Sequence, residues 1–280
     1  MTPAGALHPV DAPEFNLAVT LASGQVFHWL PQGAGYAGVI GATPAYVEQR
    51  GDRLFTSADP ALVARYFALD HPLPEIYRTF PADPVMAAAL DLCRGMRIIR
   101  QPAWECLATF ITSSMKQVTH IAQISHTLRV RYGPPVARGG PFAYPGPARL
   151  AALTEEDLRA CALGYRARNL LKTARMIAAG EVDLDAIRSM PDDLAGAELC
   201  RLAGVGEKVA NCVLLFAYER VRAFPIDVWI ERVLREHYFK GRRKVTAGKL
   251  RDFSRSHFGE FGGYAQQYLF HHARSARRKV

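Results

Sequence analysis

Lys208 and Asp227 are the two side chains whose types and surroundings could carry covalent chemistry in this sequence. Lys208 lies just inside an apolar helical pattern, and Asp227 begins the next one. The positive end of a helix dipole disfavours a charged ammonium, so this position favours the neutral amine that a nucleophile needs. A carboxylate close by could stabilise positive charge that develops during the reaction. The pair predicts a lysine nucleophile with an assisting aspartate, although a solvated lysine and an N-cap aspartate would explain each residue alone.

Two glycines, Gly204 and Gly206, flank Val205 just before Lys208. Glycines at this spacing permit a tight turn with positive φ and a close approach of the backbone. Backbone amides at the start of the following helix would then bind an anion, helped by the helix dipole. The three residues predict a phosphate-binding hairpin, and an ordinary helix–helix turn is the alternative that so short a pattern leaves open.

The charge of the whole chain indicates a polyanionic partner. The 280 residues carry a net charge of +9, which favours nucleic acid or a membrane surface. No apolar run of about 18 residues could span a bilayer, and the N-terminus lacks the basic and apolar regions of a secretory signal. The five cysteines are scattered without a CxxC pair, which indicates reduced thiols and argues against a cysteine-ligated iron–sulfur cluster or structural zinc: Cys93, Cys106, Cys161, Cys200 and Cys212.

The elements that must hold these residues change in type along the chain. Up to about residue 80 short segments rich in Val, Tyr, Phe and Trp predict strands, with a hairpin turn near Gly51-Asp52. From about residue 83 apolar residues recur at helical spacing. The predicted fold class is α+β, with a small N-terminal antiparallel β domain (1–82) followed by a mostly α-helical domain (83–280) that contains a helix-hairpin-helix motif at about 195–220. The predicted strands are 25–30, 36–41, 45–51 and 53–57, and the predicted helical segments include 83–96, 102–115, 119–133, 154–164, 166–180, 193–204, 207–219 and 227–239.

The stretch "LAGVGEKVANCVLLFAYERVRAFPIDVWIERV" (202–233) resembles the helix-hairpin-helix DNA glycosylase superfamily. The resemblance implies that the hairpin Gly204–Gly206 grips DNA phosphate, that Lys208 is the catalytic nucleophile, and that Asp227 assists it. The stretch "LASGQVFHW" (21–29) resembles the 8-oxoguanine DNA glycosylase branch of that superfamily. The resemblance implies that the carbonyl of Gly24 accepts the N7 hydrogen that 8-oxoguanine has and guanine lacks.

Two further segments extend the resemblance to the pocket for the damaged base. In "GGYAQQYLFHHA" (262–273) the resemblance implies that Gln266 meets the Watson–Crick edge of the flipped base and that Phe270 stacks on its face. The two residues are i and i+4, so a helix presents them on one side. Cys212 is i+4 from Lys208, and the resemblance implies that it covers the other face of the base. A core helix would explain Phe270 equally well, whereas an inward Gln266 would be awkward there.

The segments expected to enter the duplex depart from the pattern of the family. "GYRAR" (164–168) matches the stretch whose tyrosine wedges into DNA and whose arginine reads the orphaned base, here Tyr165 and Arg166. The asparagine-containing wedge of the family is replaced by "SSMKQVTH" (113–120). Its residues Met115, Lys116 and Gln117 lie at the wedge, and His120 stands where the family has an arginine that reads the opposite cytosine. Trp229 replaces a histidine of eukaryotic members. A strict preference for cytosine opposite the lesion is therefore not expected.

The predicted function is excision of 8-oxoguanine from double-stranded DNA by base flipping, with abasic-site lyase activity through a lysine Schiff base. No cofactor or metal is expected. The predicted partner is DNA that contains an oxidised purine, the predicted state is a monomer, and membrane contact is not expected. The expected location is the nucleoid of a bacterial cytoplasm or a eukaryotic nucleus. Two alternatives stay open: a glycosylase for alkylated bases such as 3-methyladenine on the same fold, and a non-catalytic DNA-binding module.

Overall fold

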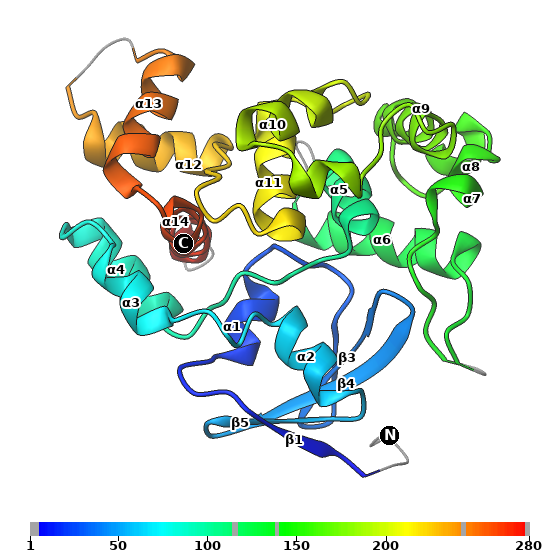
Figure 1. Ribbon diagram of the computed structural model, residues 1–280, viewed down its shortest axis with the longest axis horizontal. Coiled ribbons are helices and arrows are strands. Elements are labelled where there is room, and N and C mark those ends of the chain that lie inside the picture. The colour runs from blue at the N-terminus through cyan, green and yellow to red at the C-terminus, as the bar shows by residue number, and fades with distance from the viewer. Residues whose placement is uncertain (1–5, 114–116, 138–139, 242–244, 278–280) are drawn as a thin grey trace.

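The computed structural model describes residues 6–113, 117–137, 140–241 and 245–277 and has the predicted α+β fold class. In Figure 1 the N-terminal sheet occupies the lower part of the molecule, and the helices that follow it lie above and beside it. The predicted wedge residues Met115 and Lys116 lie outside the described residues. The division of the chain at residue 82 stays a prediction.

The sheet is antiparallel and has the strand order β1-β5-β4-β3-β2. Its strands are β1 (His8–Asp11), β2 (Leu30–Gln32), β3 (Gly35–Ile40), β4 (Thr43–Arg50) and β5 (Arg53–Thr56). Arg50 pairs with Arg53 across the turn at residues 51–52, so the predicted hairpin is confirmed. Gly51 has a φ of +58°, a conformation that two-residue hairpin turns require and that glycine adopts without steric cost.

The predicted strand at residues 25–30 is wrong, because only Leu30 enters the sheet. Residues 25–29 instead lack regular secondary structure, with Val26, Phe27 and Trp29 buried. Their polar groups are satisfied by distant partners rather than by a strand: the Gln101 amide donates to the carbonyl of Gln25 at 2.7 Å. The apolar and aromatic residues of this segment therefore indicated burial and not pairing in a sheet.

The N-terminal part also contains three short helices in the region predicted to be strands: α1 (Leu17–Ala22), α2 (Pro60–Tyr66) and α3 (Leu73–Arg78). Asn16 caps α1 by accepting from the Val19 amide at 3.0 Å. Asp59 caps α2 by accepting from the Leu62 amide at 2.9 Å, and proline follows the cap. Both capping residues are visible in the sequence. Helices this short, however, contain too few apolar residues for the helical spacing to be recognised.

The helical domain follows the predicted segments closely. Its long helices are α4 (Pro84–Cys93), α5 (Ala103–Ser113), α6 (Val118–Tyr132), α9 (Arg166–Ala178), α10 (Asp192–Cys200), α11 (Glu207–Tyr218), α13 (Ala247–Phe258) and α14 (Gly262–Arg277). Shorter elements are α7 (Pro147–Ala151), α8 (Glu155–Arg159), the 3-10 turn η1 (Ala186–Ser189), α12 (Val228–Val233) and the π-helical turn η2 (Leu234–Tyr238). Helices α10 and α11 flank the hairpin at 201–206, as predicted for the helix-hairpin-helix motif.

Two hydrophobic cores stabilise the chain, a large one among the helices and a smaller one between the sheet, α1 and α2. A buried polar cluster joins the two parts. Arg129 of α6 pairs with Glu105 of α5, and Glu105 lies 3.2 Å from His28 Nδ1. His28 Nε2 donates to the carbonyl of Val39 in β3 at 2.8 Å. Burial lowers the pKa of His28 and raises that of Glu105, so this cluster fixes the sheet against α5 at the cost of desolvating charge.

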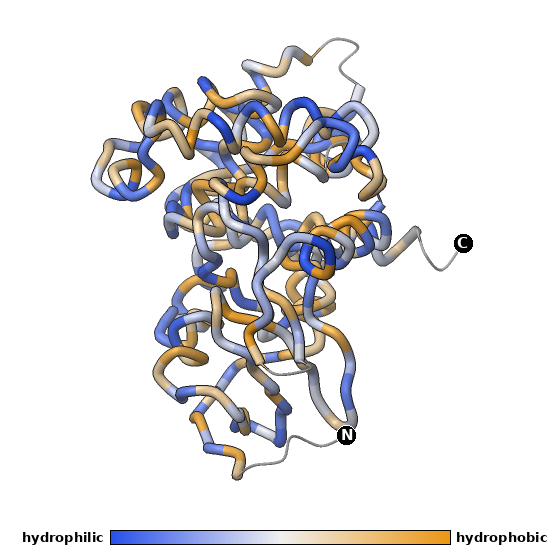
Figure 2. The backbone as a smooth tube through the Cα atoms, turned by 90° about the vertical axis from the view of Figure 1, so that its right-hand side faces the viewer, coloured by the Kyte–Doolittle hydropathy of each residue, from blue (hydrophilic) through white to orange (hydrophobic). Residues whose placement is uncertain are grey.

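The hydropathy of the chain is mixed along its whole length. Figure 2 shows hydrophobic and hydrophilic residues alternating along the tube at short intervals. Among the described residues no helix has the length and apolar character needed to cross a membrane.

Candidate active site

Lys208 and Asp227 line the same space in the folded chain. Two cavities of about 400 and 40 Å³ share both residues, together with Gly24, Phe110 and Phe270. These residues come from the loop after α1, the C-terminal half of α5, the start of α11, the start of α12, and α14. Residues up to about 250 positions apart in sequence therefore meet here, which is where a reaction centre between two domains is expected.

Lys208 reaches the cavity from the first turn of α11, where the sequence predicted it. Its Nζ donates to Ser113 Oγ at 3.3 Å and lies 5.2 Å from the centre of the Phe110 ring. The Ser113 hydroxyl donates in turn to the carbonyl of Phe110 at 2.8 Å, so its lone pairs are available to the lysine. Within the described chain Lys208 forms no ion pair. The amine is thus held by one hydroxyl and one ring, and the Asp227 carboxylate interacts with its charge without forming a direct ion pair.

Asp227 is the N-cap of α12, as predicted, and it also faces the cavity. Oδ1 accepts from the amides of Trp229 at 3.0 Å and Ile230 at 2.9 Å. Oδ2 accepts no hydrogen bond from the residues that the structure describes. Burial raises the pKa of Asp227, and the backbone donors and the Lys208 charge oppose this shift only in part. One oxygen therefore fixes the carboxylate, and the other is free to meet a developing positive charge.

The four residues predicted to hold the base converge on the smaller cavity: Gly24, Cys212, Gln266 and Phe270. Burial raises the pKa of the Cys212 thiol to about 11, so Cys212 is a neutral apolar wall near neutral pH. Gln266 is 4% exposed, and in the described part of the chain its Oε1 has no hydrogen-bond partner. A buried amide oxygen without a donor is costly in a fold, and such groups are typical of places built for a ligand.

The predicted hairpin has the expected backbone with one difference. Gly204 has a φ of +79°, and Gly204 and Gly206 are exposed. The amide of Val205, by contrast, donates to the carbonyl of Leu202 at 3.1 Å, so it is not one of the free donors. The amides available to an anion are therefore those of the glycines and of the first turn of α11.

The predicted duplex-contacting residues that the structure describes differ in exposure, and one of them lines the cavity of about 400 Å³. Gln117 lines its rim, and His120 is exposed on α6. Tyr165 is 58% exposed at the start of α9, as a wedge requires. Arg166 is only 5% exposed, with its Cζ 4.3 Å from the Tyr165 ring, so its predicted reading of the orphaned base depends on a rearrangement. These roles stay predictions.

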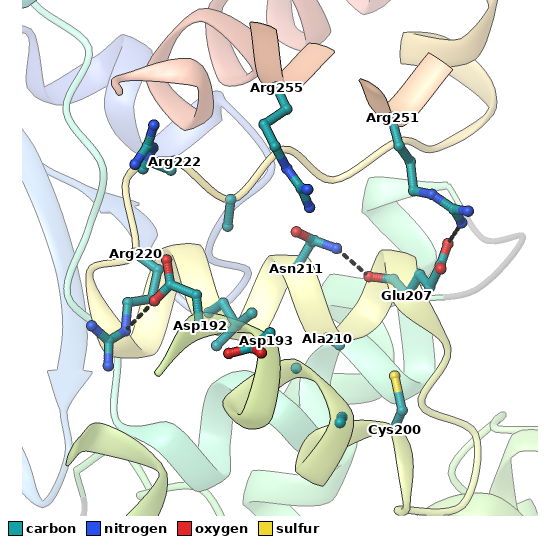
Figure 3. Close-up of a pocket in the computed structure, with 14 residues that line it drawn as sticks. Asp192, Asp193, Cys200, Glu207, Ala210, Asn211, Arg220, Arg222, Arg251 and Arg255 are labelled. Carbon is teal, nitrogen blue, oxygen red and sulfur yellow. Dashed lines mark hydrogen bonds and ion pairs between the residues drawn. The ribbon is translucent and has the colours of Figure 1, made fainter. Parts of the chain in front are cut away.

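A larger cavity, of about 710 Å³, lies on another side of α11 and is lined by none of the predicted site residues. Figure 3 shows it between α10, α11 and α13, with Arg251 paired to Glu207 and Arg220 paired to Asp192. Its walls carry both charge signs, and Lys208 does not line it. This cavity therefore contains none of the candidate catalytic residues in spite of its volume.

Sequence reasoning missed several residues that line the two site cavities, among them Phe27, Phe110, Ser113 and Arg274. Arg274 is i+4 from Phe270, and helical spacing could have found it. Phe27 and Phe110 face each other with ring centres 6.2 Å apart, a contact between the two domains that no local pattern encodes. Among the described residues no group of three or more His, Cys, Asp or Glu side chains could hold a metal ion.

Comparison with known proteins places these residues in a family. The N-terminal domain model of 8-oxoguanine DNA glycosylase matches residues 8–107, and the model of HhH-GPD superfamily base excision DNA repair proteins matches residues 108–254. A probable N-glycosylase/DNA lyase of Methanothermobacter thermautotrophicus is 31% identical over 222 residues, covering 71% of this chain and 70% of that protein. The N-glycosylase/DNA lyase OGG1 of Arabidopsis thaliana is 30% identical over 281 residues, covering 92% and 77%.

A solved structure shows the same architecture. The 8-oxoguanine glycosylase/lyase of Clostridium acetobutylicum, in complex with double-stranded DNA containing cytosine opposite 8-oxoguanine, superposes with a TM-score of 0.90. The two chains are 30% identical, and the match covers 97% of this chain and 96% of the other. The similarity therefore extends over both the sheet and the helical part.

Proposed function

Because the chain belongs to the 8-oxoguanine DNA glycosylase family, we propose that it excises 8-oxoguanine from double-stranded DNA and cleaves the resulting abasic site. The observation that carries the proposal is the meeting of Lys208, Asp227, Gly24 and Gln266 around joined cavities. A nucleophilic amine, a carboxylate and a recess that can bind a flipped base are the parts that lysine-dependent base excision needs. The enzyme is accordingly a bifunctional N-glycosylase and DNA lyase.

Binding starts from charge. The net charge of +9 attracts DNA, and the amides of the hairpin hold a phosphate, so affinity falls steeply with salt. The damaged nucleotide leaves the stack at a cost of about a few kcal/mol of unstacking. Tyr165 is a candidate for filling the gap, since it is the large exposed side chain nearest the start of α9.

Recognition uses the recess beside the lysine. The ring of Phe270 and the thiol of Cys212 cover the two faces of the base, and the unpartnered Oε1 of Gln266 accepts from its Watson–Crick edge. The carbonyl of Gly24 accepts from N7–H of 8-oxoguanine. Guanine has a lone pair at N7, which would leave two acceptors facing each other.

Chemistry follows from the positions of the two catalytic residues. The free amine of Lys208 attacks C1′ of the sugar, and the bond from C1′ to N9 breaks with its electrons leaving on the base. Asp227 stabilises the positive charge that develops on the sugar. Loss of a proton and ring opening give a Schiff base between Nζ and C1′, and removal of a C2′ proton expels the 3′ phosphate by β-elimination.

Borohydride trapping tests this proposal. Wild-type protein incubated with an 8-oxoguanine duplex and borohydride should form a covalent complex, and Lys208→Gln should form none. Lys172→Gln, which removes an exposed lysine from α9, is the matched control and should trap like wild type. Release of 3-methyladenine without a trapped adduct would instead identify a glycosylase for alkylated bases, and DNA binding without any base release would identify a non-catalytic module.

Two finer points belong to the same proposal. The enzyme should tolerate bases other than cytosine opposite the lesion, because His120 replaces an arginine and is exposed. Cleavage of duplexes with each of the four opposing bases measures this. Acting on the genome, the protein should lie in the bacterial nucleoid or the eukaryotic nucleus, which imaging of a tagged chain would show.

A further inference from the structure

The turn that follows α1 is held by hydrogen bonds to its carbonyl oxygens, with one exception. The Ala22 carbonyl accepts from Arg274 Nη2, and the Ser23 carbonyl accepts from Gln267 Nε2 at 3.0 Å. The Gln25 carbonyl accepts from Gln101 Nε2 at 2.7 Å. The carbonyl of Gly24 accepts no hydrogen bond from any residue that the structure describes. Hydrogen bonds therefore fix the turn on both sides of Gly24, whose carbonyl remains available as an acceptor at the cavity.

Arg274 is the most distant of these partners in sequence and lines the larger of the two site cavities, whereas Gln267 lines the smaller one. Its Cζ lies 5.4 Å from the centre of the Phe270 ring, one helical turn earlier on α14. Its Nη2 also lies 3.2 Å from His271 Nδ1. Burial lowers the pKa of His271 to about 4, so the imidazole is neutral near neutral pH and Nδ1 can accept from the guanidinium. Arg274 is held by α14 and in turn holds the Ala22 carbonyl.

The fit between Arg274 and Gly24 leaves no spare room. Gly24 has a φ of +87°, and a Cβ at this position would lie 2.6 Å from Arg274 Nη1 and 3.2 Å from Phe270 Cε1. Any side chain other than hydrogen would displace the guanidinium, besides straining the backbone. The guanidinium and the ring of Phe270 therefore both pack against Gly24, and the guanidinium also lies beside the ring.

We propose that Arg274 is a positioning residue that fixes the Gly24 carbonyl against Phe270 and thereby sets the discrimination between 8-oxoguanine and guanine. This inference rests on the proposed function, since it assigns a determinant of specificity to the same site. The guanidinium acts through the turn and needs no contact with the base. A carbonyl that can rotate or retreat would lose the bond to N7–H and also the repulsion against the N7 lone pair of guanine.

Binding by an inactive enzyme tests the inference. In the Lys208→Gln background, Kd is measured for otherwise identical duplexes containing 8-oxoguanine or guanine. Arg274→Met keeps the length and apolar stem but removes every donor, and it should reduce the ratio of the two Kd values about tenfold or more, as expected for loss of a hydrogen bond from a charged group. Arg65→Met removes the same charge from an exposed position on α2 and should leave the ratio unchanged.

Cleavage of a preformed abasic site separates positioning from general damage. With Lys208 intact, Arg274→Met should cleave abasic DNA within about twofold of wild type while excising 8-oxoguanine at least about tenfold more slowly. An unchanged Kd ratio, or equal losses on both substrates, would overturn the inference. If the Lys208→Gln protein with Arg274 intact does not prefer 8-oxoguanine over guanine, the proposed function is refuted and the inference with it. This outcome is distinguishable, because it is measured before any Arg274 variant is compared.

Discussion

Replacing Asp227 by asparagine separates the two roles that one carboxylate combines. Oδ1 caps α12 through the amides of Trp229 and Ile230 at 3.0 and 2.9 Å, and an asparagine oxygen can accept both bonds. Asn and Asp are nearly equal as N-caps, so stability should change by less than about 0.5 kcal/mol, whereas Asp227→Ala should cost about 0.5–2 kcal/mol. Catalysis should suffer more, because a neutral amide cannot stabilise a positive sugar. A loss of about 10²–10³ in the excision rate corresponds to about 2.7–4 kcal/mol.

The pH dependence of stability gives the same variant a second readout. Burial raises the pKa of Asp227 above its ordinary value of 3.8, so the folded state binds this proton more tightly than the unfolded chain does. Ionisation of Asp227 therefore lowers the stability of the folded state. The loss of stability is absent below the pKa of Asp227 in the unfolded chain and complete above its pKa in the folded state. The Tm of Asp227→Asn relative to wild type should rise as pH increases from about 4 to neutral.

Single-turnover excision of 8-oxoguanine and thermal unfolding together measure this prediction. The expected pattern is an asparagine variant that is folded as well as wild type, binds the lesion duplex and excises it very slowly. Excision within about threefold of wild type would show that the charge of Asp227 contributes little to the transition state. A loss of stability as large as that of the alanine variant would show that Oδ1 is not the capping group.

Three further perturbations have outcomes that follow from the geometry. Ser113→Ala removes the acceptor of Lys208 Nζ and should slow borohydride trapping about three- to tenfold with little change in Kd for DNA, because one neutral hydrogen bond is lost; equal trapping rates would contradict this. Arg129→Met leaves Glu105 buried without its cation and should cost about 3–5 kcal/mol in urea unfolding, less at low pH where the carboxyl can protonate; a cost independent of pH would argue against this explanation. Gly204→Ala forces a side chain to a φ of +79° and should cost about 1–2 kcal/mol and weaken DNA binding at low salt, whereas unchanged binding would place the phosphate elsewhere.

Much of the site could be predicted because its parts are local. Lys208 and Cys212 lie one helical turn apart, as do Gln266 and Phe270, so helix geometry alone aims each pair in one direction. Capping is equally local, since Asp227 binds amides two and three residues later. The hairpin turn at 51–52 was predicted from its turn residues, and the long helices were predicted from the helical spacing of their apolar residues. Both signals are local as well.

The errors occurred where distant contacts outweigh local preference. Residues 25–29 have the composition of a strand, yet they pair with no strand. The Gln101 side chain donates to the Gln25 carbonyl, and the Gln25 side chain binds the backbone of Arg97 and Ile99. The helices α1 and α2 have readable caps, but too few turns for a periodic signal. Arg166, predicted to read the orphaned base, is buried beside Tyr165, and its role stays a prediction.

The sequence by itself determined which groups could react: an amine after a glycine hairpin, a carboxylate at a helix start, and an amide and a ring on one helical face. Only the tertiary structure decided that these groups share one space, that Ser113 and Phe110 hold the amine, and that Arg274 holds the turn of Gly24. The reason is physical. Helix spacing and caps depend on neighbours within four residues, whereas a cavity is defined by the packing of elements that are close only after the chain has folded.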